Sequence, residues 1–109
     1  MSDDYKLRVE VEKLHSHGAA WIGILLDDTF RLEICEWDSE IYGDHSTYYD
    51  VRVEDKPLLF NALSDHVGKT IVNDEALIAT TASAFPGSLQ ILNWLQRVGI
   101  PLKEHWAYV

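Results

Sequence analysis

The sequence predicts one α+β domain, residues 1–109, with a mainly antiparallel sheet of four to six strands and two or three helices packed on one face. Its length of 109 residues is common for a single domain. Alternating apolar and polar side chains, typical of half-buried strands, fill much of the first half. Helical spacing begins only after residue 56, and strands followed by helices are typical of the α+β class.

Four strands are expected in the first half. Leu7, Val9 and Val11 alternate with charged residues, which indicates a strand with one covered face. The next apolar segment has no polar face, so we interpret it as a central strand. The predicted strands cover residues 5–14, 19–26, 30–37 and 47–54, with a polar loop at residues 38–46 around Gly43.

Strand alternation also predicts which side chains share a face of the sheet. The helices are expected to cover the face with the aliphatic residues Val9, Leu32, Ile34, Val51 and Val53. The opposite face is expected to be more exposed, and it contains Glu33, Trp37, Tyr48, Asp50 and Glu54.

Two helices are indicated by their boundary residues. Pro57 suits a first helical turn and Gly68 suits the end of that helix. A second helix is predicted from Ser88, taken as its N-cap, to Gly99. The weak alternation in residues 102–109 indicates a last strand.

The segment 73–85 fits two structures. Residues 70–72 and 76–81 fit a hairpin through Asn73-Asp74, and Thr80-Thr81 favours this because β-branched residues prefer strands. The same residues also fit a helix capped by Asn73 or Asp74.

The negative charge is concentrated in one part of the chain. The formal net charge is -9. Residues 27–55 contain ten acidic side chains against two bases, Arg31 and Arg52, which gives -8. Because nucleic-acid binding depends on Lys and Arg neutralising phosphates, we expect no direct nucleic-acid binding.

The remaining composition predicts a cytoplasmic protein that does not enter a membrane. No apolar run reaches the length of a membrane-spanning helix, and Met1-Ser2-Asp3-Asp4 is unlike a signal peptide. Cys35, the single cysteine, cannot form an internal disulfide. These features favour a reducing compartment.

The sequence contains no motif that supports catalysis, so we expect a non-enzyme without metal or cofactor. His15 and His17 are two residues apart, but zinc needs three or four ligands. Cys35 is expected to be structural, since neighbouring Glu36 does not favour a reactive thiolate.

An acidic, aromatic-rich segment is the candidate binding site. Its alternative interpretation is a solvated face that maintains solubility. We favour partner binding, because tyrosine and tryptophan are frequent at interface hot spots and the carboxylates would attract a basic protein. Trp21, Trp94 and Trp106 lie in apolar segments and are assigned to the core or its edge. The predicted partner-binding residues are Glu36, Trp37, Asp38, Glu40, Tyr42, Asp44, Tyr48 and Asp50.

One segment resembles a known group of proteins. Pro86-Gly87-Ser88, Asn93-Trp94-Leu95 and Gly99-Ile100-Pro101 are similar to the helix and exit of some immunity proteins of bacterial toxin systems, including contact-dependent inhibition. This resemblance covers a small part of the chain and transfers no functional residue. It implies inhibition of a basic toxin domain, often a nuclease, by an acidic surface that replaces substrate phosphates.

Two other functions remain open. The chain could mimic nucleic acid and inhibit a DNA-binding protein. It could also be a small enzyme or ligand-binding domain, with His45, Cys35 or His105 in a cleft. The oligomeric state is left open.

Overall fold

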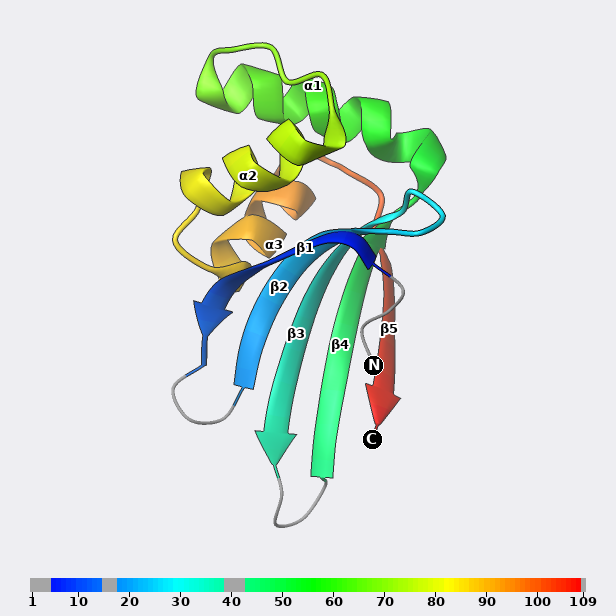
Figure 1. Cartoon of the computed structure of the whole chain (residues 1–109). Helices are drawn as coiled ribbons and strands as arrows, with labels where there is room; N and C mark the ends of the chain where they lie inside the picture. The colour runs from blue at the N-terminus through cyan, green and yellow to red at the C-terminus, as the bar shows by residue number, and fades with distance from the viewer. Residues whose placement is uncertain (1–4, 15–17, 39–42, 109) are drawn as a thin grey trace.

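The computed structural model describes residues 5–14, 18–38 and 43–108, and residues 37, 38, 43, 44 and 108 for their backbone alone. It confirms the α+β class, with a five-stranded antiparallel sheet and three α-helices (Figure 1). The strands are β1 Tyr5–Lys13, β2 Gly18–Leu25, β3 Phe30–Asp38, β4 Gly43–Val51 and β5 Lys103–Tyr108. The helices are α1 Lys56–Val67, α2 Asp74–Ala84 and α3 Ser88–Arg97, preceded by the 3-10 helix η1 Val53–Asp55.

The strands lie in the order β1-β2-β3-β4-β5, with β1 and β5 at the two edges. The predicted polar loop at 38–46 is too long, because β3 and β4 pair up to Asp38 and Gly43. The predicted fourth strand, residues 47–54, extends too far toward the C-terminus, because β4 ends at Val51. The backbone N–H of Asp55 donates to the carbonyl of Arg52 at 2.9 Å, and this 3-10 turn leads into α1.

Helix α1 begins and ends where Pro57 and Gly68 predict. Pro57 lies in the first turn, where its missing N–H has no helical partner to lose. Gly68 ends the helix in the left-handed region, at a φ of 74°, and its N–H donates to the carbonyl of Ser64 at 2.9 Å.

Residues 74–84 form the helix α2, so the preference for a strand was wrong. The side chain of Asn73 accepts a hydrogen bond from the N–H of Ala76 at 2.8 Å, which caps the helix. Buried Thr81 donates its hydroxyl to the carbonyl of Leu77 at 2.7 Å. Threonine tolerates a helix when its hydroxyl bonds the preceding turn, and burial of Leu77 and Ile78 outweighs its strand preference.

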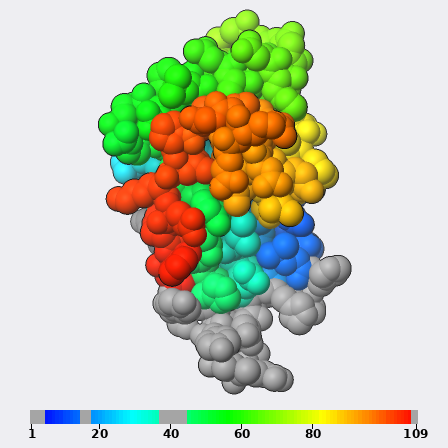
Figure 2. Space-filling model, turned by 180° about the vertical axis from the view of Figure 1, so that it is seen from behind, coloured from blue at the N-terminus to red at the C-terminus, as the bar shows by residue number. Residues whose placement is uncertain are grey.

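The helices cover one face of the sheet. Helix α2 packs on β1 and β2, α3 contacts β3, and α1 packs on α2. Figure 2 views this face and shows β3 and β4 uncovered below α3. Among the predicted core residues Leu32 and Val51 are fully buried, whereas Val53 lies on η1 and is exposed. The core contains Ile22, Ile24, Phe30, Leu32, Val51, Leu59, Leu63, Leu77, Ile91, Trp94 and Leu95.

Of the three tryptophans assigned to the core or its edge, Trp94 lies in the core. Trp94 is buried at 2% exposure, between the helices and the sheet. Trp106 is 65% exposed on the edge strand β5. Trp21 is half-buried, and on β2 it alternates with the core residues Ile22 and Ile24. Sequence hydrophobicity does not reveal that Trp21 and Trp106 lie outside the helix–sheet interface.

One acidic side chain joins the sheet to α3. The backbone N–H and the hydroxyl of Ser88 both donate to Glu12 Oε1, at 2.9 and 2.6 Å. Gly87, not Ser88, is the N-cap, because the Ser88 hydroxyl is directed to Glu12 across the interface. A carboxylate at this position also complements the positive end of the helix dipole.

Replacing Glu12 should therefore weaken the attachment of α3. We expect Glu12→Ala to lower the free energy of unfolding by about 2 kcal/mol, since it removes both hydrogen bonds to a charged acceptor. Glu12→Gln retains an acceptor oxygen and should lose less. Urea unfolding measures both, with Glu10→Ala on the same strand as the control. Equal losses in Glu10→Ala and Glu12→Ala would contradict this role.

Candidate functional site

The face of the sheet opposite the helices, here called the open face, contains two neighbouring rows of side chains. Arg8, Arg31 and Asp50 belong to one row, in which Gly23 lies between the two arginines. Trp21, Glu33, Tyr48 and His105 form the second row. The cross-strand register thus brings arginine, carboxylate and aromatic side chains together from all five strands.

An Arg31–Asp50 ion pair lies at the centre of the open face. Arg31 Nε and Nη2 donate to the two carboxylate oxygens of Asp50, at 2.7 and 2.9 Å. His105 Nε2 lies 3.0 Å from Asp50 Oδ2. The hydrogen bond to Asp50 raises the pKa of Arg31 above its usual value. Such a bidentate pair fixes both side chains and neutralises the buried carboxylate.

A second buried carboxylate, Glu33, receives hydrogen bonds from β1. The Tyr5 hydroxyl donates to Glu33 Oε1 at 2.5 Å, and Arg8 Nη2 lies 3.4 Å from the same oxygen. Burial raises the pKa of Tyr5 above its usual value, and the hydrogen bond to Glu33 adds to this effect. Glu33 therefore does not present a free charge on the open face.

Gly23 provides the space that Tyr5 occupies. A Cβ atom at position 23 would lie 2.5 and 2.6 Å from two atoms of the Tyr5 ring and 2.4 Å from the carbonyl oxygen of Leu7. The ring thus lies against the backbone of β2, where any larger residue would displace it. Glycine in the interior of a strand is frequent at such close approaches.

The aromatic rings of the open face stack with its arginines. Arg8 Cζ lies 4.3 Å from the centroid of the Trp21 ring and 5.0 Å from that of Tyr5. Arg31 Cζ lies 4.3 Å from the Tyr48 centroid. These distances are in the range of cation–π contacts. The result is a fixed surface of Trp, Tyr and Arg, the residue types enriched at interface hot spots.

The structure divides the predicted partner-binding residues into two groups. Tyr48 and Asp50 belong to the open face, but Asp50 is buried and paired with Arg31, so it is not an exposed acidic contact. The others belong to residues 36–45, here called the acidic hairpin. Glu36 is exposed and lies 3.6 Å from His45 Nε2. Trp37, Asp38 and Asp44 lie on the paired strands, whereas Glu40 and Tyr42 are outside the described residues.

Sequence analysis missed Tyr5, Arg8, Trp21 and Arg31 as members of one surface. The available signal was Gly23 within the apolar segment of β2, because glycine there indicates a close approach by another group. The pairing of Arg31 with Asp50 depends on the strand register, which the separate strand patterns do not specify.

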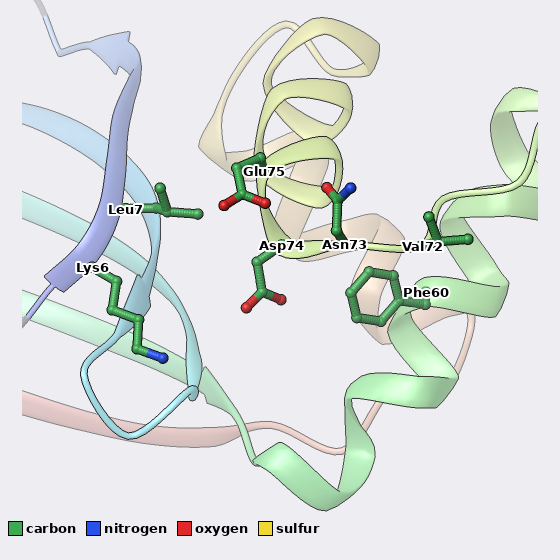
Figure 3. Close-up of a pocket in the computed structure, with 7 residues that line it drawn as sticks. All are labelled: Lys6, Leu7, Phe60, Val72, Asn73, Asp74 and Glu75. Atoms are coloured by element: carbon green, nitrogen blue, oxygen red, sulfur yellow. The ribbon is translucent and has the colours of Figure 1, made fainter.

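A surface groove lies elsewhere, between β1, α1 and the start of α2 (Figure 3). It has a volume of about 590 Å³, with Leu7, Phe60 and Val72 as apolar lining. Among its charged lining groups, Lys6 pairs with Asp28 and Asp74 pairs with Lys56, whereas Glu75 is exposed.

Other site types find little support in the described part of the chain. Residues 5–14, 18–38 and 43–108 include no cluster of three potential metal ligands, and His15 and His17 lie outside them. Cys35 is a free, half-buried cysteine. No helix in these ranges is long and apolar enough to cross a membrane.

Comparison with known proteins adds no functional information. No protein-family model, curated protein or solved structure matches this chain.

The role of Gly23 can be tested by adding one methyl group. We expect Gly23→Ala to lower the free energy of unfolding by about 1–3 kcal/mol, because the new Cβ would overlap the Tyr5 ring and the Leu7 carbonyl. Urea unfolding of Gly23→Ala, Tyr5→Ala and the double variant would separate the two overlaps. Loss of the ring should relieve part of the Gly23→Ala effect, and strictly additive losses would contradict the contact.

Tyr5 should make stability sensitive to alkaline pH. Its pKa in the folded chain lies above the value of about 10 in the unfolded chain, so the folded state retains the proton. This contribution is complete below pH 10 and is lost as the pH rises further. Unfolding free energies measured on both sides of pH 10 should fall more for the wild type than for Tyr5→Phe. Equal decreases would show that Tyr5 does not retain its proton in the folded state.

Proposed function

We propose that this chain is an inhibitory binding protein, an immunity protein that neutralises a basic toxin domain in the bacterial cytoplasm. Its contact surface would combine the acidic hairpin with the adjacent open face. The main support is the distribution of charge: the carboxylates of the open face have internal partners, and the acidic hairpin has a large excess of acid.

The acidic hairpin contains four carboxylates and no lysine or arginine. Residues 36–45 therefore have a net charge of -4, with His45 neutral. In Figure 1 the paired ends of β3 and β4, at Asp38 and Gly43, lie at the end of the sheet furthest from the helices. An excess of carboxylates in this part of the sequence would attract a cationic partner over a distance and accelerate its association.

The open face would supply the short-range contacts. Trp21 and Tyr48 are half-buried and stacked with arginines, so little side-chain entropy remains to be lost on binding. The two central carboxylates of the open face, Glu33 and Asp50, are paired within the chain. The aromatic and arginine side chains of this face would therefore make the contacts to a partner. In this proposal the acidic hairpin sets the association rate, and the open face sets the lifetime of the complex.

Charge reversal in the acidic hairpin tests this function. The candidate partner is the product of the reading frame beside the gene of this chain, produced as a purified domain. We expect Asp38→Lys with Asp44→Lys to slow its association with this chain by about tenfold or more at low salt. Stopped-flow fluorescence measures the rate, and rescue of growth on co-expression measures neutralisation. Asp50 is left unchanged because it pairs with Arg31.

The matched control is Asp65→Lys with Glu75→Lys. These two acids are exposed on α1 and α2, and their reversal changes the net charge by the same amount. The control should retain most of the association rate. Equal slowing by both pairs would mean that only total charge matters, and failure of the neighbouring gene product to bind would oppose an immunity function.

A further inference from the structure

Arg8 has hydrogen-bonding capacity that the chain does not use. A guanidinium group has five N–H donors. Among the described residues Arg8 makes one contact to an acceptor, Nη2 to Glu33 Oε1, at the long distance of 3.4 Å. Its Nε is buried without a partner, and its Nη1 has no partner in the same part of the chain. About a quarter of the Arg8 side chain, 26%, remains exposed.

Arg31, the other arginine in this row, does not have such unused N–H donors toward its carboxylate. Arg31 lies on the same row of the open face and uses two nitrogens on Asp50, at 2.7 and 2.9 Å. Its side chain is 15% exposed. Glu33 cannot satisfy Arg8 in the same way, because Oε1 already accepts the shorter hydrogen bond from Tyr5.

The orientation of Arg8 is nevertheless well restricted. The rings of Trp21 and Tyr5 lie 4.3 and 5.0 Å from its Cζ atom, and Gly23 allows the Tyr5 ring to approach. A guanidinium held in this way loses little freedom when it binds a planar oxyanion. Arginine forms its strongest contacts with carboxylates and phosphates through such paired N–H groups.

We infer that Arg8 is a recognition point for a carboxylate of the protein partner, an aspartate or glutamate side chain on an otherwise basic surface. This inference rests on the proposed function. A carboxylate fits better than a phosphate because Glu33 is close to Arg8 and the chain has a net charge of -9. A singly charged group within a cationic partner meets less repulsion than a polyanion.

This arrangement would provide selectivity among basic partners. The acidic hairpin attracts any cationic surface. Arg8 would increase the affinity only for a surface that places a carboxylate against its guanidinium group. A partner without that carboxylate would cover the exposed part of the guanidinium and leave its terminal N–H donors unpaired, which costs affinity.

The inference can be tested on the free protein with acetate as the carboxylate. NMR spectra would follow the Arg8 Nε–H and the Trp21 indole N–H during titration with sodium acetate, sodium chloride or sodium phosphate at matched ionic strength. We expect a saturable shift of both signals with acetate, with half-saturation at roughly ten to a hundred millimolar. Arg8→Lys retains the charge but not the paired donors, so it should abolish the Trp21 shift.

Three outcomes would overturn the inference. Shifts that are the same in chloride and acetate would show an effect of ionic strength alone. A stronger response to phosphate than to acetate would assign the site to phosphate groups. Persistence of the Trp21 shift in Arg8→Lys would place the anion elsewhere. Because these measurements need no partner, they are independent of the success or failure of the proposed immunity function.

Discussion

A five-stranded sheet with helices on only one side must stabilise its other face without a second apolar layer. In this chain the solution is reciprocal pairing on the open face. Arg31 neutralises Asp50, and Tyr5 and Arg8 contact Glu33. Each charged group is half-buried or buried, so loss of one partner would leave the other with an unmet hydrogen-bonding requirement. The face is therefore polar but rigid.

The opposite face is stabilised by apolar burial, together with a polar contact to α3. Ile22, Phe30 and Leu32 are fully buried under the helical layer. Glu12 on β1 connects the sheet to α3, because its carboxylate accepts two hydrogen bonds from Ser88. The two faces are thus coupled through β1, which supplies Tyr5 and Arg8 to one side and Glu12 to α3.

Local patterns predict most of the fold, whereas the site depends on contacts between distant residues. Alternation located the strands, and Pro57 and Gly68 located α1, since these signals lie within a few residues of each element. Helix α2 was only the second of two interpretations of its sequence, because the local preference of Thr80-Thr81 for strands does not reveal the burial of Thr81 that outweighs it. The pairing of Asp50 with Arg31, 19 residues away, requires the register of β3 and β4.

The same register explains why the acidic excess is concentrated at one end of the molecule. In the centre of the sheet, Arg31 on β3 binds Asp50 on β4, and Tyr5 on β1 reaches across β2 to Glu33 on β3. Residues 36–45 include no arginine or lysine that could do so within the hairpin itself. Repulsion among carboxylates on the paired ends of β3 and β4, such as Asp38 and Asp44, costs less than it would in the centre of the sheet, where solvent screening is weaker. Charge that would destabilise the open face is therefore tolerated at the hairpin, where it remains available to a cationic partner.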